Sequence, residues 1–422
     1  MLDIKFIKEN KDLIKEGARK KHISFDVDAL LAVEEKRMAA LTAFEGYRTE
    51  QNKLSDEIPK APSPEVRAQL LEKLVPLKAQ VQEAEESLKA IMKEWQLLML
   101  QVPNVPDVSV PDGEDDAQNQ EVRVWGEKKT FSFQPKSHIE IMENLDMADF
   151  EKGTAVSGFR GYFLKNDGAH LSFAIWNYAR DFWMKRGFDF MIVPSLVRKQ
   201  TLLGSGYLPQ GEEDLYKTQD EDYLAGTAEV ATMSYFADTV LIESEFPKKM
   251  LSFSPCFRRE AGAHSKDVKG LIRVHEFFKL EQVVLCEANH ETSARLHEEI
   301  NRNTEEFIES LNIPYHTVVN CGGDLGLGQV KKFDIELWVP GEETYREISS
   351  ASYFHDFQTR RLGIKYRDES GKLKFAHSLN CTAIPTPRIL VSLIENYQDA
   401  DGNVVVPEVL RPYLGKDIIT KK

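Results

Sequence analysis

Two stretches near the start of the chain carry apolar residues at alternating spacings of four and three. The longer stretch has these positions: Leu70, Leu74, Leu77, Val81, Ala84, Leu88, Ile91, Trp95 and Leu98. Residues 33–58 follow the same alternation. Such a repeat predicts a coiled-coil seam on each of two helices. The proline-rich segment 59–64 separates them, so we expect an antiparallel two-helix hairpin over about 28–98.

The hairpin departs from an ideal coiled coil in a few places. Arg37 and Gln51 put polar side chains on the first seam, and Pro76 lies within the second helix, where we expect a kink. Residues 28–98 hold 10 Lys and Arg against 13 Asp and Glu, so this arm is not a basic patch. A dimerisation or spacing role therefore stays open beside a role in binding RNA.

Periodicity changes after the hairpin. The Pro-, Asp- and Gly-rich stretch that follows predicts a linker at 106–120 between an N-terminal domain, 1–105, and a second domain, 121–422. The second domain mixes strand-like runs with amphipathic helices in no regular repeat. This mixture favours an α+β body on an antiparallel sheet flanked by helices. Within it, the helical and then apolar pattern of 168–194 predicts a long helix followed by a strand.

Residues 256–281 predict a hairpin with a strongly charged face. Alternation places Arg258 with Glu260 on one face of the first strand. On the second strand it aligns Arg273, His275, Phe277, Lys279 and Glu281. A hairpin buried only for packing would not carry this much charge on one side. Guanidinium groups suit phosphate, an aromatic ring suits a base, and a carboxylate suits an ammonium or hydroxyl group.

Two later stretches add candidate chemistry. Glu347 and Ser350 follow the acidic strand 333–339, and their oxygens suit Mg²⁺ shared with nucleotide phosphates, although alternating acidic residues also mark a solvent-facing strand. Pro387 suits the first turn of a helix, which would place Arg388 at a helix N-terminus that favours phosphate. The alternative for this second stretch is a capped helix with an exposed arginine.

Composition narrows the class of protein. The chain has 422 residues, 42% of them hydrophobic, and a net charge of −14, which counts against wholesale binding to nucleic acid. No apolar run is long enough to span a bilayer and the start lacks a secretory signal, so we expect a cytoplasmic protein. The scattered cysteines and histidines predict neither disulfides nor a zinc site. The run Gly322–Gly328 lacks a P-loop ending and predicts a turn cluster.

Taken in order, the arm and the three charged stretches resemble the seryl-tRNA synthetases, which are class II aminoacyl-tRNA synthetases, over nearly the whole chain. Gly187–Pro194 resembles the first class motif, Phe257–Glu260 with its hairpin the second, and Arg388 with its helix the third. The features typical of serine-specific members are Gly226-Thr227-Ala228-Glu229, the hairpin end at Glu281, Glu347–Ser350 and Val406–Pro412.

The resemblance implies a class II catalytic domain that activates L-serine with ATP and Mg²⁺ and transfers it to the 3′ end of tRNA(Ser). It also implies transfer to tRNA(Sec), a homodimer formed through 168–194, and neither zinc nor a membrane. Two alternatives remain. One is a catalytically altered paralogue that binds RNA or protein, and the other is a ligase that loads an amino acid onto a carrier protein. The retained charges argue against the first and the full-length arm against the second.

The resemblance also implies roles for individual residues. Arg258 would contact the ATP α-phosphate, Phe277 would stack on adenine and Arg388 would hold the γ-phosphate. The catalytic residues would be Arg258, Glu260 and Arg388. The serine site would comprise Thr227, Ala228, Glu229, Glu281, Asn380 and Thr382. The ATP site would comprise Arg258, Arg259, Glu260, Val274, Phe277, Glu347, Ile348, Ser349, Ser350 and Arg388. Mg²⁺ would bind Glu347 and Ser350, and the arm would hold tRNA through Arg48, Lys53 and Lys60.

The chain departs from the family pattern at two places. Asn380-Cys381-Thr382 and two prolines replace a glycine-rich run, although Thr382 retains a hydroxyl where serine is usual. Glu276 stands where glutamine is common, and alternation points it away from Phe277, so we expect little effect on the site.

Overall fold

The computed structural model describes residues 1–261 and 267–421. Residues 262–266, which belong to the polar loop expected between the two charged strands, lie outside the described residues. The chain divides into two compact units. The first comprises 1–19 and 23–103, and the second comprises 20–22 and 104–422.

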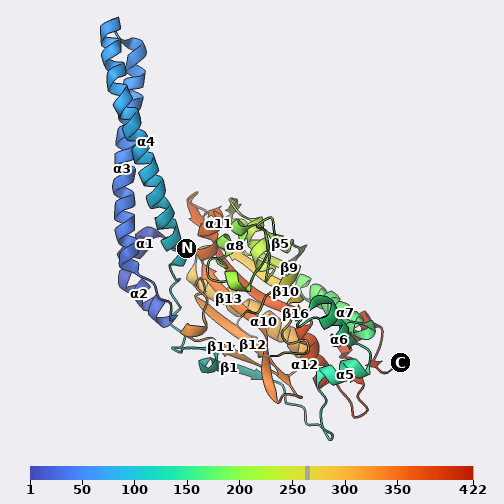
Figure 1. Ribbon diagram of the computed structural model, residues 1–422. Coiled ribbons are helices and arrows are strands. Elements are labelled where there is room, and N and C mark those ends of the chain that lie inside the picture. The colour runs from blue at the N-terminus through green and yellow to red at the C-terminus, as the bar shows by residue number, and fades with distance from the viewer. Residues whose placement is uncertain (262–266, 422) are drawn as a thin grey trace. The chain divides into compact units, whose positions relative to one another are not determined.

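The first unit contains the predicted helical hairpin. Its helices are α1 (Ile4–Glu9), α2 (Lys11–Lys20, whose last residue is assigned to the second unit), α3 (Val27–Glu57) and α4 (Pro64–Gln101), with the 3-10 turn η1 (Ile58–Lys60) after α3. Figure 1 shows α3 and α4 packed side by side along the hairpin. In the first turn of α3 the Asp26 carboxylate accepts from Asp28 N and Ala29 N, and in the first turn of α4 the Ser63 hydroxyl accepts from Val66 N. The heptad prediction is therefore confirmed.

The polar seam position Arg37 has partners within this hairpin. Its Nε donates to Glu34 Oε2 at 2.6 Å, and its guanidinium lies 5.0 Å from the ring centre of Trp95 on α4. An ion pair and a cation–π contact thus replace an apolar seam contact. Helix α4 continues through Pro76 as one element, and Leu74 and Leu77, on either side of it, are buried.

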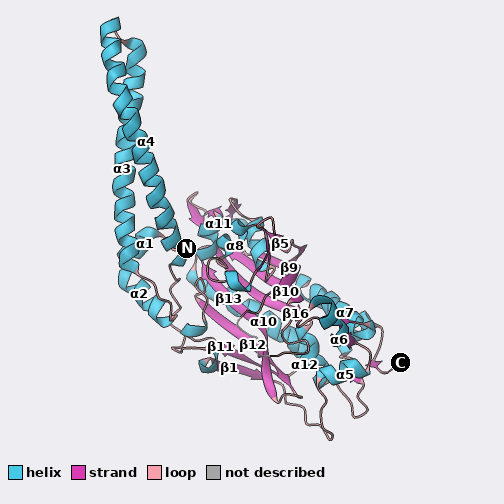
Figure 2. Ribbon diagram, in the orientation of Figure 1, coloured by secondary structure: helices cyan, strands magenta, loops and turns pink. Residues whose placement is uncertain are grey.

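The second unit is built on an eight-stranded sheet (Figure 2). In spatial order its strands are β1 (Gln120–Trp125), β11 (Tyr315–Val319), β12 (Lys331–Val339), β13 (Thr344–His355), β16 (His377–Thr386), β10 (Glu276–Cys286), β9 (Lys248–Phe257) and β4 (Asp189–Ile192). Neighbours are antiparallel except β4 and β9, which are parallel. The α+β prediction is confirmed.

Helices cover this sheet and its ends. They are α5 (His138–Asn144), α6 (Phe150–Ser157), α7 (Asn166–Met184), α8 (Lys199–Ser205), α9 (Glu229–Tyr235), α10 (His290–Ser310), α11 (Phe357–Leu362), α12 (Arg388–Asn396) and α13 (Arg411–Leu414). The helix α10 packs on β13 and β16, and its Ile300 and Phe307 belong to the main core together with Trp183 of α7. Gln282 and Cys381 point to α10, so by alternation Glu281 and Thr382 point to the opposite face. That opposite face carries the candidate site.

Small strand pairs and turns complete the unit. The strands are β2 (Ala148–Asp149) with β3 (Phe163–Leu164), β5 (Leu196–Val197), β6 (Tyr216–Lys217) and β7 (Tyr223–Leu224), β8 (Val240–Ile242) with β14 (Lys365–Arg367) and β15 (Leu373–Phe375), and β17 (Val404–Val405) with β18 (Ile418–Ile419). The 3-10 turns are η2 (Asp116–Gln118), η3 (Glu212–Asp214), η4 (Glu243–Glu245), η5 (Gly322–Asp324) and η6 (Glu408–Leu410). Across the part of the chain that the structure describes, every helix is too short or too polar to cross a membrane.

The glycine-rich run forms a turn, as predicted. It contains η5, and the carbonyl oxygens of Gly326, Leu327 and Gln329 accept from Lys21 Nζ at 3.0, 2.9 and 2.5 Å. Carbonyl groups that converge on an ammonium group present negative potential, which disfavours phosphate.

The segment that follows the hairpin, from Asn104 onward, belongs to the second unit and forms hydrogen bonds within it. Asn104 N donates to Leu327 O at 2.9 Å, and Asn104 Nδ2 donates to Phe354 O at 2.8 Å. The Tyr353 hydroxyl donates to Asp107 Oδ2 at 2.8 Å.

Candidate active site

Strands β9 and β10 bring the charged residues of the hairpin together. Their register pairs Cys256 with Phe277, Ser254 with Lys279 and Ser252 with Glu281. Directly paired residues share a face, so the aromatic ring, the ammonium and the carboxylate line one side of the sheet. This part of the sequence prediction is confirmed.

The loop of the hairpin is longer than expected. Strand β9 ends at Phe257 and β10 begins at Glu276, so the alternation assigned to Arg273 and His275 does not apply. Glu260 has a positive φ of 53°, which ends the extended conformation, and its carboxylate forms an ion pair with Arg273. Arg258 N still donates to His275 O at 3.0 Å, and beyond this pair the ion pair of Glu260 with Arg273 joins the two sides of the loop.

A cavity lies between the hairpin, β13 and α12. Its lining consists of Arg258, Glu260, Leu271, Ile272, Val274, Phe277, Lys279, Glu347, Ile348, Thr382, Pro385, Thr386, Pro387 and Arg388. The Arg258 guanidinium lies 5.4 Å from the ring centre of Phe277, and its Nε donates to Gly226 O at 3.3 Å. A positive group above an aromatic ring suits a ligand that joins phosphate to a flat base.

Arg388 begins helix α12, as the sequence predicted. Its Nε donates to Ile272 O at 2.8 Å, and its Nη1 donates to Glu347 O at 3.0 Å. Burial lowers the pKa of the guanidinium, and the carboxylate of Glu347 opposes this shift. The two backbone carbonyls fix the direction of the side chain at the edge of the cavity.

A polar cluster adjoins this cavity on the same face. Lys279 Nζ lies 2.9 Å from Glu281 Oε2, 3.2 Å from Thr227 Oγ1 and 3.3 Å from Thr382 Oγ1. Where β10 pairs with β16, the register changes between Leu280 and Glu281 at a β-bulge. This bulge sets Thr382 directly opposite Glu281. Lys279 and Glu281 are buried, so this ion pair is shielded from solvent.

Glu229 provides a second buried carboxylate beside the first. It begins α9 directly after Thr227 and Ala228, and its oxygens accept from Gln358 Nε2 at 2.5 Å and from Asn380 Nδ2 at 2.7 Å. Burial raises the pKa of Glu229 to about 7, and the nearby Glu281 carboxylate adds to the shift. Asn380 Nδ2 also lies 3.4 Å from Glu281 Oε1 and so links the two carboxylates.

A second bulge brings together the residues predicted to bind a metal. Glu347 and Ser350 stand three positions apart, and in a regular strand this spacing would put them on opposite faces of the sheet. The register of β12 with β13 pairs Ser350 with Asp334 and, after a shift, Glu347 with Glu336. The carboxylates and the hydroxyl therefore share one face. Burial raises the pKa of Asp334 to about 6, opposed by Lys332 and reinforced by Glu347.

Some predicted site residues point elsewhere. Arg259 Nη1 donates to Glu213 O at 3.2 Å, outside the cavity lining. The Ser349 hydroxyl donates to Thr382 O at 2.5 Å on the face that carries α10. Cys381, which departs from the glycine-rich family pattern, also points to the face that carries α10, with Sγ 3.5 Å from Thr304 Oγ1. This departure therefore leaves the site face unchanged. In the first unit, the predicted arm residues Arg48, Lys53 and Lys60 are exposed.

The structure adds residues that the sequence prediction left out of the site. Lys279 alternates with Phe277 and Glu281, and its position on the charged face was the available signal. Asp334 lies in the acidic strand that precedes Glu347, and that strand was the available signal. Gln358, whose Oε1 accepts from the Ser378 hydroxyl at 2.7 Å, reaches Glu229 only through the fold, so no signal near Glu229 could have found it.

Comparison with known proteins gives consistent matches along the chain. Residues 1–106 match the model of the seryl-tRNA synthetase N-terminal domain, and residues 214–397 match the class II tRNA synthetase core domain shared by the G, H, P, S and T enzymes. The serine–tRNA ligase of Deinococcus radiodurans is 46% identical over 98% of both chains. That of Thermodesulfovibrio yellowstonii is 40% identical over 99% of this chain and 100% of its own.

Solved structures agree with these matches. Seryl-tRNA synthetase from Pyrococcus horikoshii, solved in complex with ATP, superposes with a TM-score of 0.90 and 36% identity over 100% of both chains. The cytoplasmic serine–tRNA ligase of Naegleria fowleri, solved with AMP, gives a TM-score of 0.87 and 34% identity over 100% of this chain and 99% of its own.

Proposed function

Because this chain belongs to the seryl-tRNA synthetases, class II enzymes that attach serine to tRNA, we propose that the polar cluster binds serine and the adjoining cavity binds ATP. The observation that carries this assignment is the pair of buried carboxylates, Glu229 and Glu281, beside a cavity that presents Arg258, Phe277 and Arg388. The first group suits a small cation with a hydroxyl, and the second suits a nucleotide triphosphate.

Serine binds through charge and hydrogen bonds in this proposal. The carboxylates of Glu229 and Glu281 attract its ammonium group, while Thr227, Thr382 and Asn380 pair with the remaining polar atoms. Ala228 is the N-cap residue of α9 and directly precedes Glu229. Asn380 Oδ1 is buried without a hydrogen-bond partner among the described residues, which leaves an acceptor for the substrate. Lys279 balances the charge of the two carboxylates and draws the serine carboxylate toward the nucleotide.

ATP lies with its adenine on Phe277 and Val274 and with its phosphates between Arg258 and Arg388. An oxygen of the serine carboxylate attacks the α-phosphorus, the bond to the bridging oxygen breaks, and pyrophosphate leaves. Arg258 neutralises charge at the α-phosphate and Arg388 does so at the γ-phosphate. Glu260 lines the cavity and forms an ion pair with Arg273. The terminal hydroxyl of tRNA then attacks the seryl carbonyl, and AMP leaves.

Mg²⁺ fits the face of β12 and β13. Carboxylate and hydroxyl oxygens from Glu347 and Ser350 are hard ligands, and the neighbouring Asp334 has a buried Oδ1 without a hydrogen-bond partner among the described residues. When bound, Mg²⁺ would neutralise phosphate charge. Ile348 lines the cavity. The Ser349 hydroxyl is bonded to Thr382 O, so Ser349 contributes to the ATP site through its backbone.

The helical hairpin of the first unit is proposed to hold tRNA(Ser), and tRNA(Sec) as well. Exposed Arg48, Lys53 and Lys60 lie at or near the turn between α3 and α4, where phosphate contacts position an RNA without reading its bases. Replacing these three residues with Ala should raise the KM for tRNA. The matched variant K78A/K89A/K93A removes equal charge elsewhere in the hairpin and should have less effect. Equal effects would contradict a local contact.

We also propose a homodimer formed through α7 and β4. Phe173, Phe190 and Ile192 are exposed, β4 is an edge strand of the sheet, and aromatic residues around Trp176 line a cavity of ≈ 740 Å³ beside α7. Sedimentation should give a dimer, and I192D should shift it toward monomer. The control V108D alters an exposed valine away from this face and should leave the dimer intact.

Exchange of pyrophosphate into ATP tests the assignment of the two pockets. The exchange should require serine among the twenty amino acids, and R258A should abolish it. Strong exchange with another amino acid would overturn the serine site.

Charging of tRNA(Ser) and tRNA(Sec) transcripts then tests the acceptors. Deleting 36–92 should preserve exchange and depress transfer, whereas equal loss of both would make the arm a folding element. A cytoplasmic location remains part of the proposal.

A further inference from the structure

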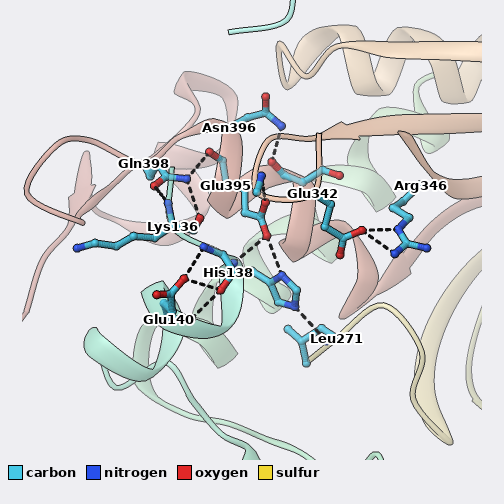
Figure 3. Close-up of polar contacts among 12 residues, drawn as sticks. Lys136, His138, Glu140, Leu271, Glu342, Arg346, Glu395, Asn396 and Gln398 are labelled. Atoms are coloured by element: carbon cyan, nitrogen blue, oxygen red, sulfur yellow. Dashed lines mark hydrogen bonds and ion pairs between the residues drawn. The ribbon is translucent and has the colours of Figure 1, made fainter. Parts of the chain in front are cut away.

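A buried histidine and carboxylate join α12 to the end of the hairpin loop. His138, at the start of α5, and Glu395, in α12, have exposures of 3% and 0%. Glu395 Oε1 accepts from His138 N and contacts His138 Nδ1, each at 2.8 Å, and Glu395 Oε2 accepts from Gly341 N at 2.8 Å. On its other side, the imidazole accepts from Leu271 N through Nε2 at 3.3 Å (Figure 3).

These contacts define the proton positions on His138. A backbone amide can only donate, so Leu271 N–H requires a free lone pair on Nε2. The ring proton of the neutral imidazole therefore sits on Nδ1 and points to Glu395 Oε1. A carboxylate that accepts from one ring nitrogen fixes the tautomer and orientation of the other. Glu395 thus holds His138 as an acceptor for the loop.

Helix α12 holds two consecutive residues of the loop from different points. Glu395 acts on Leu271 through His138, while Arg388 binds the carbonyl of Ile272 directly at 2.8 Å. The two residues of α12 stand seven positions apart, or about 10 Å along the helix axis. Two separated contacts fix the orientation of a segment better than one. Val274 of the proposed ATP site follows within two residues.

The packing at this point leaves no room for a side chain on Gly270. A Cβ atom there would lie 2.5 Å from His138 Nε2, and the residue has a φ of 101°. Both the left-handed backbone and the close approach of the ring require glycine. The imidazole is therefore in contact with the loop over Gly270 as well as Leu271.

We propose that His138, oriented by Glu395, is a positioning residue for ATP. It holds Gly270–Ile272 so that the Ile272 carbonyl aims the Arg388 guanidinium and Val274 keeps its place in the cavity. The inference rests on the proposed ATP-binding roles of Arg388 and Val274. It assigns no contact between His138 and the substrate, and it predicts an effect on ATP without an effect on serine.

Two substitutions separate the two halves of the contact. In H138N, the short amide can still donate to Glu395 but cannot reach Leu271. In H138Q, the longer amide can place its oxygen near the position of Nε2 and accept from Leu271. For serine-dependent exchange, H138N should raise the KM for ATP about tenfold, and H138Q should keep it within about threefold of the unaltered enzyme. Neither should change the KM for serine.

A variant of the neighbouring residue controls for loss of stability. Asn396 Nδ2 donates to Trp338 O at 2.9 Å and to Ser392 O at 2.8 Å, so N396S weakens α12 without touching the loop. It should lower the melting temperature and leave the KM for ATP unchanged. The inference is overturned if H138N and H138Q raise that KM equally, if neither raises it, or if N396S raises it as much as H138N.

A measurement on the unaltered chain covers the case in which H138N does not fold. Hydrogen exchange should show a protected amide at Leu271, and exchange at the rate of an exposed amide would overturn the inference. The variant G270A, which displaces the loop from His138, should raise the KM for ATP as H138N does; an unchanged KM counts against the proposal. Absence of serine-dependent exchange in the unaltered enzyme would instead mark failure of the proposed function.

Discussion

Serine binding should depend on pH through Glu229. Burial next to Glu281 raises its pKa to about 7, while hydrogen bonds from Gln358 and Asn380 and the charge of Lys279 oppose the shift. Only the ionised carboxylate attracts the ammonium group of serine, which stays protonated near neutral pH. As the pH falls through 7, Glu229 takes up a proton and the attraction is lost.

The size of the effect follows from this titration. For a group with a pKa of about 7, the ionised fraction falls from about 0.9 at pH 8 to about 0.1 at pH 6. The pH dependence of kcat/KM reports the ionisation of groups in the free enzyme. The kcat/KM for serine in pyrophosphate exchange should therefore fall about tenfold from pH 8 to pH 6. The titration of Glu229 predicts no matching change in the KM for ATP at saturating serine.

Substitution isolates the responsible group. E229Q should lower kcat/KM for serine about tenfold or more at pH 8, since a charge-assisted contact is lost, and it should flatten the profile between pH 6 and 8. E276Q changes an exposed glutamate and should preserve the profile. A flat profile in the unaltered enzyme, or an unchanged pH dependence in E229Q, would refute the reasoning.

Three further substitutions test the site. K279M leaves the buried Glu281 carboxylate without its ion pair, so the free energy of unfolding measured in urea should fall by about 3 kcal/mol and serine-dependent exchange should be lost; unchanged stability would contradict a buried pair. D334N removes a carboxylate beside Ser350 and should raise the Mg²⁺ concentration for half-maximal exchange several-fold, with an unchanged value excluding Asp334 from the site. S349A should leave the KM for ATP unchanged, because the hydroxyl bonds Thr382 O; a large increase would mean that this hydroxyl contacts ATP.

The parts that were predictable from the sequence are those set by local periodicity. The heptad spacing required two packed helices, and the prolines at 59–64 marked the turn between them. Strand alternation correctly placed Phe277 and Glu281 on one face, and Pro387 correctly marked the start of the helix at Arg388. The alternation failed for Arg273, because the positive φ of Glu260 ends the extended conformation and its side chain pairs with Arg273 outside the strands.

The sequence by itself determined which elements form and which residue types carry the chemistry, since helix and strand periods are read from neighbouring positions. Only the tertiary structure determined which side chains that are distant in the sequence lie close together in space. Bulges set Thr382 opposite Glu281 and Glu347 beside Ser350, and register is a property of paired strands, not of either strand. His138 and Glu395 are 257 residues apart, and only the packing of α5 on α12 makes them one unit.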